Sequence, residues 1–136
     1  MKYKLLDDLT SDVMFEAYGK TFEELLENSA MAMFSVICRV EKIKPTTTIK
    51  IELSSESKEK LLYDWLSALL TRSDIHGLFL SRFKINKISG LCLSAEASGE
   101  KMSQGKGETL VKGIPYYGFK IHETDKGFSA RVTLDI

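Results

Sequence analysis

Two stretches of helical periodicity stand among segments in which apolar and polar residues alternate, and this order constrains the fold most strongly. In each stretch apolar side chains return every three or four positions, which predicts an amphipathic helix. Thr21 and Ser57 precede the two stretches and are residue types that cap helix N-termini. The apolar positions are Phe22, Leu25, Leu26, Met33, Phe34 and Ile37 in the first helix, and Leu61, Leu62, Trp65, Leu66, Leu69 and Leu70 in the second.

The alternating segments predict about seven strands. Turn-forming residues at Ser89-Gly90 and Thr124–Gly127 predict antiparallel pairing, and polar, glycine-rich Gly99–Gly107 predicts a mobile surface loop. We therefore expect residues 1–136 to form a single α+β domain, with two helices packed on one side of a largely antiparallel sheet. The expected strands lie near residues 2–6, 12–18, 46–53, 78–87, 91–98, 113–123 and 128–136.

Composition excludes several classes of protein. The chain has 19 basic and 19 acidic residues, and this balance argues against a general nucleic-acid binder. The N-terminus lacks the apolar core of a signal peptide, and the longest apolar run, Ala30 to Phe34, is too short to span a membrane. Cys38 and Cys92 stand alone, which predicts packed, reduced thiols. We expect a cytoplasmic protein.

Motifs for catalysis are missing from the sequence. Gly19-Lys20-Thr21 lacks the second glycine of a phosphate-binding loop, because position 14 is methionine. His76 and His122 are isolated from each other and from both cysteines, so no zinc pattern exists. No Gly-x-Ser-x-Gly elbow is present. We expect no catalytic residue and a protein that is not an enzyme.

Acidic groups occur at one end of two predicted strands. Asp12 begins the second strand, while Asp135 and Ile136 end the last one. If these strands are neighbours, Asp12, Asp135 and the terminal carboxylate converge, and such oxygen donors suit calcium or magnesium. Taken alone, Asp135 is more simply interpreted as a solvated edge charge. Lys112 is likewise an ordinary surface lysine on its residues alone, although a cation there would suit a partner's phosphate or carboxylate.

Six segments, in order and spread over the whole chain, resemble the archease family. They are Leu9–Val13, Ala17–Glu24, Leu62–Leu66, Phe83 in its strand, Val111–Tyr116 and Ala130–Ile136. The resemblance implies a small α+β protein with a strand–helix–strand–strand (SHS2-like) module. It also implies an accessory role toward the GTP-dependent RNA ligase of the RtcB type in tRNA splicing, whose guanylylation and turnover archeases promote. An older proposal for the family is a chaperone or modulator of RNA-processing proteins.

The resemblance also implies site residues. Asp12 matches the aspartate that ends the family's His-Thr-Ala-Asp motif, and Asp135 and Ile136 match a C-terminal pair. Together these three bind a divalent metal in the family, typically calcium. Lys112 matches a lysine implicated in ligase activation. The chain departs from the family pattern at four positions, where histidine, alanine, threonine and histidine are replaced by Leu9, Ser11, Pro115 and Tyr117, respectively.

These observations predict a non-enzymatic activator that docks transiently on an RNA ligase and uses a divalent metal site. Neither sequence-specific nucleic-acid binding nor a membrane is expected. One alternative is a metal-dependent phosphoryl-transfer enzyme with Asp12 and Asp135 as metal ligands and Lys112 as a charge stabiliser. That enzyme would need a substrate-sized cavity around Asp12, whereas an activator needs an exposed site. A third possibility is a binding module or chaperone without metal.

Overall fold

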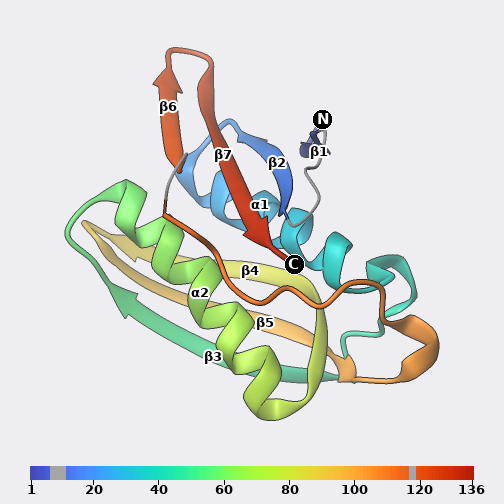
Figure 1. Cartoon of the computed structure of the whole chain (residues 1–136). Coiled ribbons are helices and arrows are strands. Elements are labelled where there is room, and N and C mark those ends of the chain that lie inside the picture. Colours follow the sequence, from blue (N-terminus) through green and yellow to red (C-terminus); the bar gives the residue numbers. More distant parts are fainter. Residues whose placement is uncertain (7–11, 117–118) are drawn as a thin grey trace.

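The computed structural model describes residues 1–6, 12–116 and 119–136 (Figure 1). Within these residues the chain forms seven strands, two α-helices and two short 3₁₀ turns. In chain order they are β1 (Tyr3–Leu5), β2 (Asp12–Gly19), α1 (Phe22–Ile37), η1 (Val40–Lys42), β3 (Thr47–Ser54), α2 (Lys58–His76), β4 (Leu78–Ser89), β5 (Cys92–Lys101), η2 (Gln104–Lys106), β6 (Lys120–Thr124) and β7 (Gly127–Asp135).

The predicted α+β class with antiparallel pairing is confirmed, and the described strands divide into two sheets. One sheet has the order β1-β2-β7-β6 and the other the order β3-β5-β4. All pairs are antiparallel. The predicted strand–helix–strand–strand module corresponds to β3, α2, β4 and β5, whose strands make up the three-stranded sheet. Alternation in a sequence shows which face of a strand is buried but not which strands share a sheet, so a second sheet was not predicted.

Helix α1 lies between the two sheets. The Phe22 ring lies 5.8 Å from the ring of Phe128 in β7, and the Phe34 ring lies 5.4 Å from the ring of Phe83 in β4. Eleven of its sixteen residues are buried, as expected for a helix that is covered on more than one side. Its N-cap is Thr21, whose side chain accepts a hydrogen bond from the Glu24 N–H (3.1 Å), as predicted.

Helix α2 packs on α1 and lies across the three-stranded sheet (Figure 1). The indole N–H of Trp65 donates to the carbonyl of Leu26 in α1 (2.9 Å), and this satisfies its one polar group in the core. Ser57 caps the helix by accepting from the Lys60 N–H (3.1 Å). Gly77 ends it in the left-handed conformation (φ 63°), which glycine adopts without a steric penalty. The predicted boundaries of this helix are thus explained by its caps.

Three local predictions were wrong. Residues 99–101 belong to β5 rather than to a loop. Gly99 lies where the backbone of β4 approaches β5 closely, and a Cβ at this position would clash with the Phe79 carbonyl oxygen. Of the predicted strand 113–123, residues 120–123 lie in β6, whereas the described residues 114–116 and 119 lie outside any strand, and Pro115 has no N–H to offer a ladder. Cys38 is buried as expected, but Cys92, the first residue of β5, is exposed.

Candidate functional site

Strands β2 and β7 bring the two predicted metal-binding aspartates side by side. The register pairs Asp12 with Asp135 at one end of the two strands and Gly19 with Phe128 at the other. The two strands are therefore neighbours, as the predicted convergence of Asp12 and Asp135 requires. Asp12 and Asp135 are direct cross-strand partners.

The backbone of Asp135 shows how close this pair is. Its N–H donates to the carbonyl of Gly113 (2.9 Å), and its carbonyl accepts from the N–H of Lys112 (2.7 Å). Both groups thus point away from β2, so Asp12 and Asp135 form a non-hydrogen-bonded pair. In such a pair the side chains lie on the same face of the sheet with Cβ atoms about 4.5–5.5 Å apart. That separation allows two carboxylates to share one cation.

The pair lies on the outer face of the four-stranded sheet. The residues that alternate with this pair along the two strands face the opposite side of the sheet. They include Phe15, Ala17 and Val132, which are buried in the core that α1 covers. Asp135 is exposed and Asp12 is partly buried. The two carboxylates are consequently open to a partner approaching the outer face, while their strands are held by the core beneath.

Lys112 reaches the same corner on a separate segment. The segment runs beside the end of β7, and Val111 and Ile114 are buried on either side of the backbone contacts to Asp135. The Lys112 side chain is exposed. Within the described residues its ammonium group makes no ion pair. The structure thus places the backbone of an exposed lysine next to that of Asp135.

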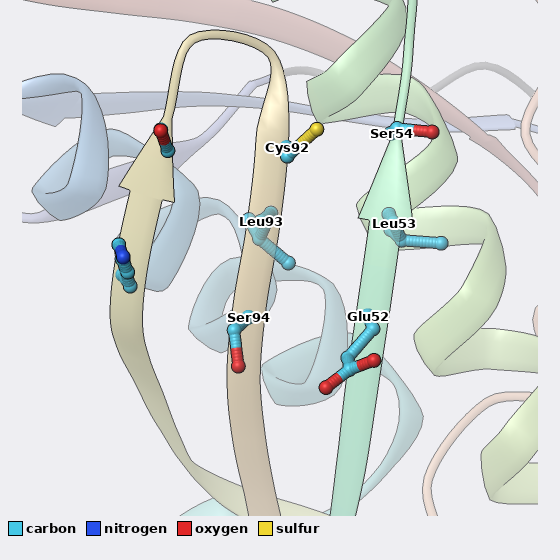
Figure 2. A pocket seen from close by; sticks show the side chains of 8 residues that line it. Glu52, Leu53, Ser54, Cys92, Leu93 and Ser94 are labelled. Atoms are coloured by element: carbon cyan, nitrogen blue, oxygen red, sulfur yellow. The ribbon is translucent and has the colours of Figure 1, made fainter.

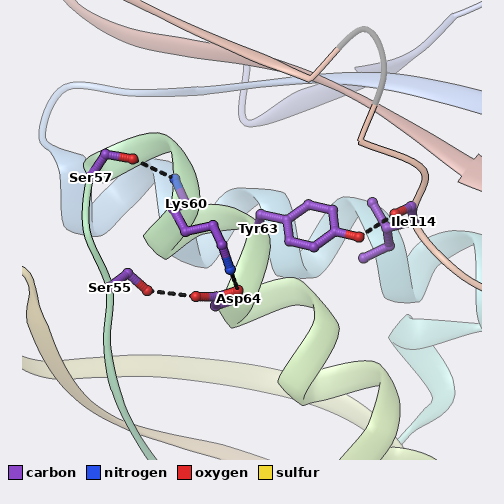
Figure 3. A network of polar contacts seen from close by, with 6 residues as sticks. All are labelled: Ser55, Ser57, Lys60, Tyr63, Asp64 and Ile114. Carbon is purple, nitrogen blue, oxygen red and sulfur yellow. Dashed lines mark hydrogen bonds and ion pairs between the residues drawn. The ribbon is translucent and has the colours of Figure 1, made fainter.

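Tyr63 of α2 holds this segment in place. Its hydroxyl donates to the Ile114 carbonyl (2.6 Å; Figure 3). Its ring lies 4.8 Å from the ring of Tyr116 and 5.4 Å from that of Phe119. In the sequence, Tyr63 is recognisable only as part of a segment that resembles the archease family. A tyrosine beside the helix's buried stripe was the one available signal for this contact.

The first turns of α2 are fixed by Asp64. Its carboxylate accepts from the Ser55 hydroxyl (2.6 Å) and from the Lys60 ammonium (2.7 Å), as Figure 3 shows. Burial tends to raise the pKa of Asp64, but the hydrogen bonds from Lys60 and Ser55 outweigh it and hold that pKa below its usual value. This network orients the helix turn from which Tyr63 reaches the Lys112 segment.

The donor set suits a hard cation in type but is small in number. Carboxylate oxygens are the ligands that calcium prefers. Ile136, the third residue of the predicted site, directly follows Asp135, and its side chain packs against the core. Across residues 1–6, 12–116 and 119–136 no three His, Cys, Asp or Glu side chains cluster closely enough to hold a metal. The metal assignment of Asp12, Asp135 and Ile136 therefore stays a prediction.

The departures from the family pattern are only partly visible. Leu9, Ser11 and Tyr117 lie outside the described residues. Pro115 is partly buried on the segment that carries Lys112.

Five surface cavities of the protein have volumes of ≈ 350–560 Å³. None of these five is lined by Asp12, Lys112 or Asp135. Figure 2 shows one of them, which is formed at the turn end of the three-stranded sheet by residues such as Glu52, Cys92 and Ser94. The predicted site is thus an exposed corner rather than part of these cavities.

No helix of the described chain is long and apolar enough to cross a membrane.

The fold and the acidic corner together define a class: small α+β proteins with a strand–helix–strand–strand module and paired carboxylates at the end of the last strand. The model of the Archease protein family (MTH1598/TM1083) matches residues 3–136. The chain therefore belongs to the archease family.

Curated relatives support this assignment over nearly the full chain. Protein archease of Methanosarcina barkeri is 38% identical, covering 99% of this chain and 96% of its own length. Protein archease of Methanothermobacter thermautotrophicus is 36% identical, covering 95% of each chain.

Two solved structures share the fold. The solution structure of Methanobacterium thermoautotrophicum protein 1598 has a TM-score of 0.83 at 33% identity and covers 98% of both chains. The crystal structure of an archease, possible chaperone, from Thermotoga maritima has a TM-score of 0.69 at 20% identity, covering 96% of this chain and 95% of its own. These structures confirm the predicted architecture.

Proposed function

We propose that this protein is a non-enzymatic accessory factor of an RtcB-type RNA ligase and promotes the ligase's guanylylation and turnover in tRNA splicing. The observation that carries the proposal is the exposed corner at which Asp12 and Asp135 oppose each other and Lys112 lies next to Asp135. Family membership supports the accessory role, and the name of the Thermotoga maritima relative, a possible chaperone, fits a protein that acts on another protein.

The aspartate pair would hold a divalent metal, calcium by donor type. Asp12 and Asp135 would supply side-chain oxygens and Ile136 its main-chain carboxylate. With so few donors from this chain, the remaining positions would be filled by water or by groups of the partner. The cation, when bound, would neutralise phosphate charge near the ligase active site.

Lys112 would meet a negative group of the ligase or of its bound nucleotide. A lysine is a cation and cannot ligate calcium, so its task on this surface differs from that of the aspartates. The hydrogen bond from the Lys112 N–H to the Asp135 carbonyl holds the backbones of these two residues side by side. Docking would therefore present both to the ligase in one orientation.

The second candidate, a metal-dependent phosphoryl-transfer enzyme, is less well supported. Such an enzyme needs a concave pocket around its metal ligands, and none of the five cavities includes them. An exposed site suits an activator better.

The test is guanylylation of the cognate ligase at limiting GTP, with and without this protein. We expect a higher yield of the ligase–GMP adduct when the protein is present. An unchanged rate and yield would contradict the proposal. Hydrolysis of GTP by this protein alone would favour the enzymatic alternative.

A further inference from the structure

An apolar groove opens where the C-terminal ends of α1 and α2 meet the connection after β5. Its volume is ≈ 360 Å³. Ile37, Leu70 and Phe79 lie at its base, and Met102 and Leu110 line it from the connection. The residues at its base belong to the core or pack against it, so the helix side of the groove is anchored in the core.

The rim of this groove exposes large apolar side chains. Leu110 is 72% exposed and Met102 is 38% exposed. Ile75, in the last turn of α2 next to groove residue Asp74, is 70% exposed. Exposed apolar side chains gathered at a groove are typical of a surface that a partner covers.

The charges of the groove are acidic. Asp74 and Glu108 line it, and no lysine or arginine is among its described lining residues. Glu108 is already engaged by Arg39 (2.8 Å), whereas Asp74 makes no ion pair within the described part of the chain. A complementary occupant therefore combines an apolar side chain with a basic one.

One short segment joins the groove to the aspartate–lysine corner. Leu110, which lines the groove, and Lys112 are both exposed and lie two positions apart, and Val111 between them is 4% exposed. A partner that contacts Lys112 has Leu110 beside it. The groove and the corner are thus adjacent along the chain.

We propose that this groove receives an apolar side chain of the RNA ligase, carried on a segment whose neighbouring basic residue pairs with Asp74. The inference rests on the proposed function and assigns the docking contact to a surface separate from the metal ligands. The apolar anchor would supply affinity, because buried apolar anchors dominate most interfaces. The Asp74 contact would set orientation and the dependence of association on salt.

The test measures the dissociation constant of the full-length protein and the cognate ligase by calorimetry. Leu110→Asp should weaken binding at least about tenfold, whereas Leu110→Met, which keeps an apolar side chain, should bind within about twofold of wild type. Asp74→Arg should weaken binding several-fold and reduce its salt dependence. Asp125→Arg, an equal charge change in the β6–β7 turn, is the matched control and should have no effect.

Calcium-dependent thermal stabilisation should be the same in all four variants, which shows that each is folded and that the metal site is intact. If the wild-type protein binds the ligase and Leu110→Asp binds it equally tightly, this inference is overturned and the proposed function stands. No ligase binding or stimulation by the wild-type protein would overturn both. A wild-type dimer in sedimentation that Leu110→Asp dissociates would assign the groove to a second copy and overturn the inference.

Discussion

Asp12 and Asp135 are direct cross-strand partners whose side chains share the outer face of the β2–β7 pair. Like charges placed opposite each other on a sheet are destabilising, so the arrangement has a structural cost when no cation is present. Asp12 is also engaged in a further interaction within the structure. A cation shared by Asp12 and Asp135, as proposed above, would relieve repulsion between them.

The first prediction concerns Asp135→Asn. Calcium bound only to the folded state raises the free energy of unfolding by about 2.7 kcal/mol at one hundred times its dissociation constant. We expect wild type to gain thermal stability with calcium and Asp135→Asn to gain none, while the metal-free melting temperatures stay close because repulsion is relieved. Differential scanning calorimetry with and without calcium measures this. Asp125→Asn, in a distant turn, should respond like wild type; full calcium stabilisation of Asp135→Asn would remove Asp135 from the metal site.

The second prediction separates Lys112 from the metal. Lys112→Ala should keep calcium stabilisation, because an ammonium group is not a calcium ligand, and should lower ligase stimulation several-fold through loss of a charge-assisted contact. A thermal-shift assay measures the calcium stabilisation, and a guanylylation assay on the same preparation measures the ligase stimulation. Lys126→Ala, an exposed lysine of the β6–β7 turn, is the control. Loss of calcium stabilisation with normal stimulation would reverse the two roles.

The third prediction tests the tether from α2. Tyr63→Phe removes the hydrogen bond to the Ile114 carbonyl, which should cost about 1 kcal/mol of unfolding free energy and loosen the Lys112 segment. We expect faster amide exchange in residues 111–116 and weaker ligase stimulation. Tyr18→Phe, which removes a hydroxyl bond to Glu16 on the sheet surface, should leave ligase stimulation unchanged. Equal stimulation by Tyr63→Phe and wild type would show that the tether does not position Lys112.

The fourth prediction uses pH. The hydrogen bonds from Lys60 and Ser55 hold the pKa of Asp64 below its unfolded value of 3.8, so the folded state binds this proton less readily than the unfolded state. The resulting stability is present above pH 3.8 and is lost as the pH falls through the folded pKa. Urea unfolding at pH 7 and at pH 3 should show wild type more stable than Asp64→Asn at the higher pH, with a smaller difference at the lower. A constant difference would contradict this assignment.

The sequence was informative where one segment determines its own structure. Thr21 and Ser57 cap the two helices, and the apolar stripe through Trp65 is buried as its spacing predicts. The closing strand places Asp135 beside Asp12, as expected if the two strands are neighbours.

Other features depend on contacts between distant segments and could not be predicted locally. Gly99 resembles a loop residue in sequence, but it lies in β5 where the backbone of β4 approaches closely. The division into two sheets depends on how α1 is covered from both sides. The contact between Tyr63 and Ile114 joins residues whose proximity no local pattern encodes.

The most direct test of the central claim is RNA joining by a catalytic amount of the cognate ligase, measured as the number of turnovers per ligase. We predict few turnovers for the ligase alone, many with the wild-type protein, and few with Asp135→Asn. The control variant Asp125→Asn should act like wild type. Equal turnover with and without the wild-type protein, at ligase concentrations well below those of RNA and GTP, would contradict it.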